Sequence, residues 1–245
     1  MMELFERTFG EIRTYIEKRD GISLDVSAYQ TKWPGGEGRN IVLSDEMALE
    51  LGNPQMESAS SLIWTERLDL IHDGRMTLIG PDIRQSAQES MPFGKVVLIG
   101  VSGFHEDNTY DRYKEMEAVR YAIDLKGYMM RAVSQYQREW SRISHDAVRN
   151  GLSFEILGHA LRKAYLKKDY VHAVEILFVT SSAEDVRALR EITNNVSRTI
   201  NALDKMINEI DADCDECEYS DVCDEVEGLR RMKKSNKKER ASSHG

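Results

Sequence analysis

The only three cysteines of this 245-residue chain lie within a short stretch near its C-terminus, where their thiols could hold a metal centre. Cys214, Cys217 and Cys223 form the pattern C-x2-C-x5-C, and thiols this close along a chain can converge on one metal. The pattern favours an iron–sulfur cluster of the [4Fe-4S] type, because zinc usually takes four ligands and neither a second cysteine pair nor a His-x3-5-His element is present. The fourth ligand would be a partner's side chain, a substrate or water, His244, or none if one iron is left open.

The residues around the cysteines are strongly acidic, which bears on the state of the thiols. Between Glu209 and Glu227 the chain carries further carboxylates at Asp211, Asp213, Asp215, Glu216, Glu218, Asp221, Asp224 and Glu225. Negative charge at this density disfavours thiolates unless a cation is bound. The acidic stretch therefore favours a bound metal over unliganded or redox-paired thiols, with structural zinc as the other metal alternative. An iron–sulfur cluster in this field would have a low reduction potential.

Composition excludes several classes of function. The chain has 42 acidic and 33 basic side chains, a formal net charge of −9, and 41% hydrophobic residues. An acidic balance argues against nucleic acid as a partner of the protein body. No apolar run approaches the length of about 18 residues that suggests a membrane span, and the N-terminal residues lack the apolar centre of a signal peptide. We therefore expect a cytoplasmic protein that binds neither membrane nor nucleic acid. No dinucleotide-binding, phosphate-loop or nucleophile motif appears, so no catalytic residue is assigned.

Changes in composition divide the chain into three parts. Residues 1–210 alternate between helical and strand patterns, and we expect them to form one domain. Residues 211–227 are the acidic cysteine segment, which we expect to bind the metal. Residues 228–245 carry seven Lys and Arg side chains in a polar stretch typical of a solvated, disordered tail.

The periodicity of apolar residues predicts the elements of the main domain. Strands are expected at residues 22–26, 40–43, 61–65, 75–80, 95–101 and 172–180, and helices at residues 3–19, across 107–150, from Ser153, and from Ser182 to about Ile210. Ser153 and Ser182 are expected to cap their helices. This order predicts an α/β or α+β fold with a mixed sheet flanked by helices, a long C-terminal helix and a cysteine-bearing tail.

Five segments, in order along the chain, resemble a known family. They are LELGNP at 49–54, DGRMTLIGPDI at 73–83, PFGKVVLIGVSG at 92–103, REWSRISHDAVRNGLSFEILG at 138–158, and VHAVEILFVT at 171–180. Together they resemble the acetyl-CoA synthase (beta) subunit of the carbon monoxide dehydrogenase/acetyl-CoA synthase complex, in the non-catalytic domain that precedes the nickel-bearing domain.

The resemblance implies a function, but the sequence also lacks one element that the family uses for that function. In the family the active nickel and iron–sulfur centre is held by cysteines that include a Cys-Gly-Cys element, which this sequence lacks. The resemblance therefore implies a partial or accessory subunit of anaerobic one-carbon metabolism, with a CO dehydrogenase, a corrinoid protein or another redox subunit as partner. Two alternatives remain: an iron–sulfur electron-transfer protein built on the same scaffold, and a non-enzymatic interaction protein with structural zinc.

The resemblance also points to Trp140 and Arg142 as residues that bind coenzyme A. We expect them on a helix, with the indole stacked on adenine and the guanidinium bound to phosphate, since arginine forks match phosphate oxygens. The alternative is that Trp140 fills the core and that Arg142 pairs with an acid such as Glu139 or Asp146.

Overall fold

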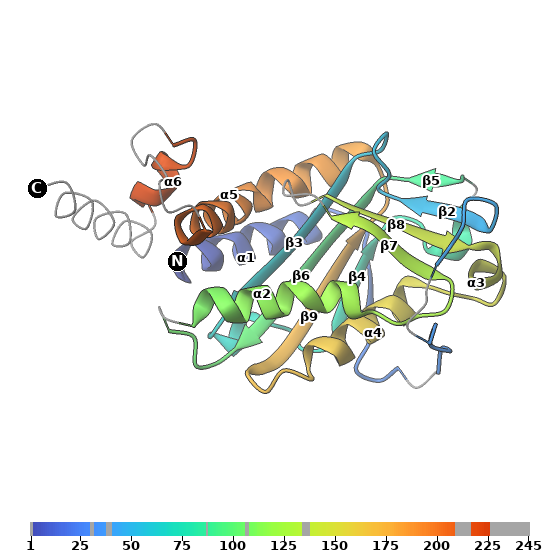
Figure 1. The fold of residues 1–245 in the computed structure, drawn as a ribbon, viewed down its shortest axis with the longest axis horizontal. Coiled ribbons are helices and arrows are strands. Elements are labelled where there is room, and N and C mark those ends of the chain that lie inside the picture. Colours follow the sequence, from blue (N-terminus) through green and yellow to red (C-terminus); the bar gives the residue numbers. More distant parts are fainter. Residues whose placement is uncertain are drawn as a thin grey trace, which may run out of the picture.

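The computed structural model describes residues 2–29, 32–37, 41–86, 88–105, 108–133, 138–208 and 217–225. Within these residues the chain forms two mixed β-sheets flanked by helices, as Figure 1 shows. The fold class expected from the sequence is therefore confirmed.

The larger sheet has five strands in the order β1 (Ile22–Asp25), β4 (Arg75–Ile79), β9 (Val171–Val179), β6 (Phe93–Val101) and β3 (Ser58–Thr65). The pairs β4/β9 and β3/β6 are parallel, whereas β6/β9 and β1/β4 are antiparallel. Every residue of β6 is buried, as its apolar sequence predicts for a strand covered on both faces. The last strand of the chain, β9, is the central strand of this sheet.

The smaller sheet has four strands in the order β5 (Ser90–Met91), β2 (Met47–Leu51), β8 (Glu139–Ser144) and β7 (Tyr128–Val133). Two sequence predictions are wrong in this part of the fold. The stretch predicted to be helical across 107–150 is helical only in part, because it contains the strands β7 and β8 between α2 and α3. In β8 the side chains alternate between buried and partly exposed with a period of two. Of the strand expected at 40–43, the described residues 41–43 are not in a strand, and Ile41 and Leu43 are exposed there.

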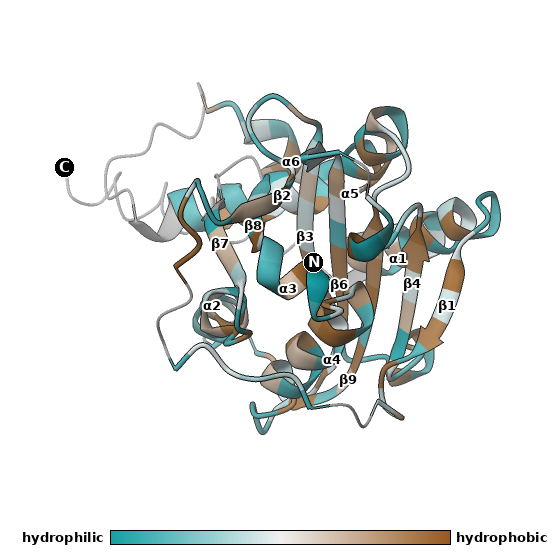
Figure 2. Cartoon of the chain, turned by 90° about the vertical axis from the view of Figure 1, so that its right-hand side faces the viewer, coloured by the Kyte–Doolittle hydropathy of each residue, from teal (hydrophilic) through white to brown (hydrophobic). Residues whose placement is uncertain are grey.

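Helices cover both faces of the larger sheet (Figure 1). On one side α1 (Met2–Glu17) and α5 (Ala183–Asn208) pack together and against β3, while α4 (Phe154–Tyr165) packs against β9 and β4 and α2 (Thr109–Val119) against α4. The remaining helices are α3 (His145–Arg149), α6 (Ser220–Glu225) and the short 3-10 turns at Leu68–Leu70, Ile83–Gln85 and Arg120–Ala122. Hydropathy along the ribbon follows this packing, with apolar strands inside and polar helix faces outside (Figure 2).

Both serine caps predicted from the sequence are present. The hydroxyl of Ser153 accepts a hydrogen bond from the amide of Ile156 (3.3 Å), and that of Ser182 accepts one from the amide of Asp185 (3.1 Å). Each satisfies an amide that the first turn of a helix leaves without a partner. The expected end of the last helix near Ile210 lies just outside the described residues.

A buried ion pair joins the two sheets. The ammonium of Lys95, on β6, lies 2.7 and 2.5 Å from the two carboxylate oxygens of Glu139, on β8, and both side chains are almost completely enclosed. The hydroxyl of Ser60 donates to the same carboxylate (2.9 Å), and Ser58 exchanges hydrogen bonds with the backbone of Glu139. Burial lowers the pKa of Lys95, and the charge of Glu139 opposes that shift. These contacts fix the start of β8 against the larger sheet.

The short helix α6 packs against α5 in a small apolar cluster separate from the main core, formed by Ala202, Leu203, Val222 and Cys223. Beside it, Arg198 of α5 holds the carboxylate of Asp221 with two hydrogen bonds of 2.7 and 2.9 Å. This pair is partly exposed and contributes about 1 kcal/mol or less. The proposed boundary between residues 210 and 211 and the basic tail at 228–245 lie outside the described residues.

Removing residues 211–245 is expected to leave a body that still unfolds in one cooperative transition, because the main core contains none of the residues that the structure describes beyond α5. The loss of the α6 cluster should cost about 1–2 kcal/mol by area, which lowers Tm by roughly 2–8 °C for a domain of this size. Thermal unfolding followed by circular dichroism measures this. Arg198→Ala in the full chain is the control, since it removes the ion pair and one hydrogen bond to the carbonyl of Glu218 but keeps the apolar cluster, and it should change Tm less. A truncated protein without a cooperative transition would show that the segment supports the main core.

Within the described ranges, no helix is both long enough and apolar enough to cross a membrane.

Candidate functional site

The strand β8 places Trp140 and Arg142 on the outward face of the smaller sheet. Glu139, Ser141 and Ile143 point inward and are buried, so the residues between them point outward. The guanidinium of Arg131, on the neighbouring β7, lies 4.9 Å from the centre of the Trp140 ring, and that of Arg142 lies 5.6 Å from it. Both distances are in the range of cation–π attraction. Trp140 and Arg142 therefore do lie together, but on a strand rather than on the expected helix.

Arg142 pairs with an acid, although not with either acid considered from the sequence. Its Nε donates to a carboxylate oxygen of Glu50 at 2.8 Å, and its Nη1 is 3.5 Å from the hydroxyl of Ser44. Glu50 lies directly across from Arg142 in the antiparallel pairing of β2 with β8, so the sheet register selects it. The amide of Asn53 donates to the other carboxylate oxygen of Glu50 (3.1 Å). These contacts hold the Arg142 guanidinium in one orientation.

The indole N–H of Trp140 is enclosed and has no hydrogen-bond partner among the described residues. A buried donor without an acceptor costs about 1–3 kcal/mol, so Trp140 holds an unmet hydrogen-bonding group beside the two guanidinium groups. Arg131 is exposed and is available to an anion. The face combines two guanidinium groups, one carboxylate and an aromatic ring, a set that can bind a phosphate-bearing aromatic ligand. We call Arg131, Trp140, Arg142 and Glu50 the Trp140 face.

Arg131 and Glu50 are functional candidates that sequence reasoning missed. Arg131 is eleven positions from Arg142, and Glu50 is separated from it by 92 positions. Both lie beside Trp140 or Arg142 only because their strands pair with β8. The prediction of a helix at this position gave no indication of that pairing. Treating residues 139–144 (EWSRIS) as a strand, with side chains that alternate between two faces, would have indicated which of them point outward. It would not have indicated the strands that flank β8.

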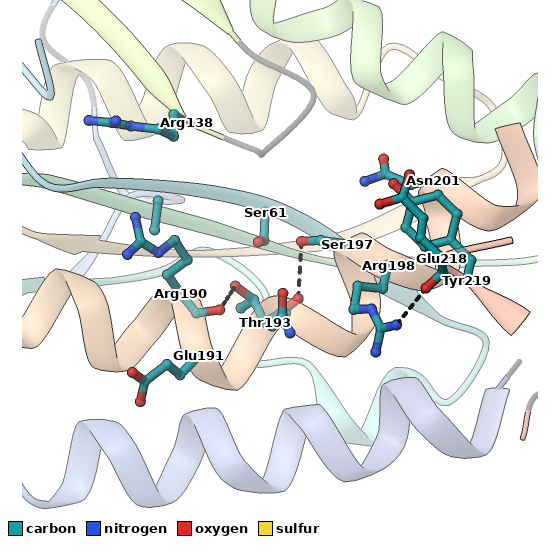
Figure 3. Close-up of a pocket in the computed structure, with 12 residues that line it drawn as sticks. Ser61, Arg138, Arg190, Glu191, Thr193, Ser197, Arg198, Asn201, Glu218 and Tyr219 are labelled. Atoms are coloured by element: carbon teal, nitrogen blue, oxygen red, sulfur yellow. Dashed lines mark hydrogen bonds between the residues drawn. The ribbon is translucent and has the colours of Figure 1, made fainter. Parts of the chain in front are cut away.

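A groove of about 620 Å³ runs between α5, β3 and the residues that precede α6. Figure 3 shows Arg190, Thr193, Ser197 and Arg198 along α5, with Arg138 on the opposite side. Its cations are largely compensated: Arg190 is 2.9 Å from a Glu57 oxygen, and Arg198 pairs with Asp221. Two of the three cations that line the groove are therefore paired with carboxylates, and we do not assign the groove a ligand.

The predicted metal ligands are described only in part. Cys214 lies outside the described residues. Cys217 is half-buried before α6, and Cys223 is buried in the small cluster on α5. In the part of the chain that the structure describes, no three side chains of ligand type converge. Cys217 is accessible enough to ligate a metal, whereas Cys223 would have to exchange its apolar contacts for the metal.

The fold and this face define a class of protein: a mixed α/β domain that presents an aromatic and cationic surface on its smaller sheet. The family described as "CO dehydrogenase/acetyl-CoA synthase complex beta subunit" matches residues 33–186, and the chain belongs to this family. The matched residues contain the Trp140 face and end before the cysteine segment.

Curated relatives agree with this assignment. The chain is 25% identical over 159 residues to the acetyl-CoA decarbonylase/synthase complex subunit beta 2 of Methanosarcina acetivorans, a match that covers 64% of this chain and 33% of the relative. It is 24% identical over 181 residues to subunit beta 1 of Methanosarcina thermophila, covering 74% and 37%. It is 23% identical over 182 residues to the beta subunit of Archaeoglobus fulgidus, covering 74% and 34%. The matches span about a third of the length of these relatives.

Proposed function

We propose that this chain is an accessory subunit of an acetyl-CoA decarbonylase/synthase type of complex, which binds coenzyme A on the Trp140 face and holds an iron–sulfur cluster on its cysteine segment. The observation that carries the coenzyme A proposal is the indole of Trp140 with two guanidinium groups 4.9 and 5.6 Å from its ring centre, and with an N–H that lacks an acceptor among the described residues. Family membership supports it, because the matched residues include this face.

Each side chain of the face has a distinct role in the proposed complex. Arg131 is exposed and meets the phosphates first, while Arg142 offers its remaining N–H groups in an orientation set by Glu50. The ring of Trp140 supports the nucleotide by stacking. Glu50 also limits affinity, because its carboxylate repels the phosphates that the arginines attract.

The cysteine segment would supply one-electron chemistry to a partner. An iron–sulfur cluster held by Cys214, Cys217 and Cys223 would transfer electrons, and the surrounding carboxylates would favour a partner with a basic docking surface. The relatives are named as subunits of a complex, which supports a protein partner. A CO dehydrogenase, a corrinoid protein or another redox subunit is the partner we propose.

Calorimetric titration of coenzyme A into the full chain tests the proposed site. Arg131→Ala is expected to weaken binding by about 1.5–3 kcal/mol, the range for a hydrogen bond to a charged group, or roughly 10- to 150-fold in Kd. The side chain is exposed, so the fold should be unaffected. Arg7→Ala, on α1 with 75% of its side chain exposed, is the matched control and should bind like the wild type. Equal affinities for the two variants, or no heat at millimolar coenzyme A, would contradict the proposal.

Glu50→Gln tests the same face through an expected gain in affinity for coenzyme A, where Arg131→Ala is expected to cause a loss. The substitution keeps the shape of the side chain and an oxygen that can accept from Arg142, but it removes the charge that repels phosphate. Tighter binding of coenzyme A than by the wild type is expected in the same titration. Weaker binding would mean that Glu50 serves mainly to position Arg142.

A further inference from the structure

A cleft of about 1020 Å³ begins at the end of β8, the strand that carries Trp140 and Arg142, and its lining includes none of the four residues of the Trp140 face. It lies between the segments at 32–37 and 41–46 on one side and α3 on the other. Ser144, the last residue of β8, lines the cleft and points to the same side of the strand as Arg142, two positions earlier. Two strand positions span about 7 Å. The Nη1 of Arg142 lies 3.5 Å from the hydroxyl of Ser44, which stands in the sequence between the cleft-lining residues Val42 and Asp45. A ligand held at Arg142 can therefore extend into the cleft.

The outer wall of the cleft is built by contacts between distant parts of the chain. The indole N–H of Trp33 donates to the backbone carbonyl of Lys126 (3.1 Å), and the amide of Gly36 donates to the carboxylate of Asp124 (2.7 Å). These bonds, across about 90 positions, tie the 33–36 segment to the loop before β7. The wall is therefore positioned before any ligand arrives, which lowers the entropic cost of binding.

The wall is also partly apolar. Ile41 is 67% exposed at its edge, and Trp33 presents an aromatic surface beside it. An exposed isoleucine gains free energy when a ligand covers it, at about 25 cal/mol for each Å² of apolar surface removed from water. The cleft thus offers apolar contact to a chain-like ligand.

The charges of the cleft differ from those of the Trp140 face. The cleft has cationic side chains at Lys32, Lys126 and Arg149 and carboxylates at Glu37, Asp45, Glu46 and Asp146. Because the two signs nearly balance, the cleft does not select an anion, whereas the Trp140 face has two guanidinium groups for one carboxylate. Lys32 and Lys126 form no salt bridge with any described residue, so their ammonium groups are available to donate to neutral carbonyl oxygens.

We infer that this cleft binds the neutral, amide-bearing arm of the ligand whose phosphates lie on the Trp140 face. Trp33 and Ile41 cover the methylene and methyl groups of the arm, and Lys126 donates to its amide carbonyls. For coenzyme A this arm is the pantetheine moiety. The inference rests on the proposed function, since it names the part of the molecule that each half of the surface binds.

The test uses calorimetry on the full chain with three probes: coenzyme A, adenosine 3′,5′-bisphosphate, which lacks the arm, and pantetheine, which lacks the phosphates. Wild type should bind coenzyme A more tightly than either fragment. Ile41→Asp places a charge at the apolar wall of the cleft and should weaken coenzyme A about tenfold, with the affinity for the bisphosphate unchanged. Ile22→Asp is the matched control, because Ile22 is also an exposed isoleucine (55%) but lies on β1.

The outcomes separate the inference from the function on which it rests. Bisphosphate binding equal to that of coenzyme A, or a coenzyme A affinity that Ile41→Asp leaves unchanged, overturns the inference and leaves the phosphate site in place. The inference also fails if Ile41→Asp weakens bisphosphate and coenzyme A equally. Absence of binding of all three probes to the wild type overturns both the inference and the proposed coenzyme A function.

Discussion

Replacing Lys95 with alanine is expected to lower the free energy of unfolding by about 3–5 kcal/mol, the cost of leaving one partner of a buried ion pair without the other. Lys95 is the only cation in contact with the carboxylate of Glu139 in the described part of the chain, and that carboxylate cannot reach water. Loss of the ammonium therefore weakens the junction between β6 and β8. Urea unfolding followed by circular dichroism measures the effect.

The double variant Lys95→Met with Glu139→Gln is the control for this prediction. It removes both charges while keeping side-chain volume, and Gln still offers an oxygen to the hydroxyl of Ser60. Replacement of a complete buried pair is often nearly neutral, so the double variant should be more stable than Lys95→Ala. If the double variant were as unstable as Lys95→Ala, a packing defect and not the orphaned charge would explain the loss.

Protein prepared without oxygen is expected to contain iron and sulfide, and Cys217→Ser should lose most of that iron, because the three cysteines are the only thiols of the chain. Cys217 is the most informative position, since it is only half-buried and its replacement should not disturb α6. Metal and sulfide analysis with visible absorption gives the result.

Tyr219→Phe, in the same segment, is the control variant and should keep the iron, because it removes only a hydroxyl group. Stoichiometric zinc without iron, in protein reconstituted anaerobically with both metals, would overturn the cluster and support the structural zinc alternative. A Cys217→Ser protein with full iron content would show that this thiol is not a ligand.

The strands of the larger sheet could be predicted because their sequences are simple. β6 and β9 are nearly uninterrupted apolar runs, as strands buried on both faces require. β8 could not be recognised in the same way, because its buried positions carry Glu139 and Ser141 while Trp140 points outward. Such polarity is stable because Lys95, 44 positions earlier, neutralises the buried carboxylate and Ser60 donates a hydrogen bond to it. Local patterns do not contain that information.

The candidate site could be predicted only in part for a related reason. Trp140 and Arg142 were identified from the resemblance, and they do share a surface. The residues that complete it, Arg131 and Glu50, come from the strands on either side of β8. Their positions depend on strand register, which is set by the whole sheet and not by the segments themselves. The cysteine segment was found from spacing alone, and its metal remains a prediction.

The position of β9 at the centre of the larger sheet has a consequence for synthesis of the chain. β4 and β6 flank β9 and do not pair with each other. The edge of each strand that pairs with β9 therefore stays unpaired until residues 171–179 have left the ribosome. Contacts that span about 70–100 positions slow folding, and two apolar strands meanwhile expose unpaired edges to other chains. Nascent chains that end before β9 should therefore depend on chaperones and should aggregate when released, whereas chains that extend through α5 should fold unaided.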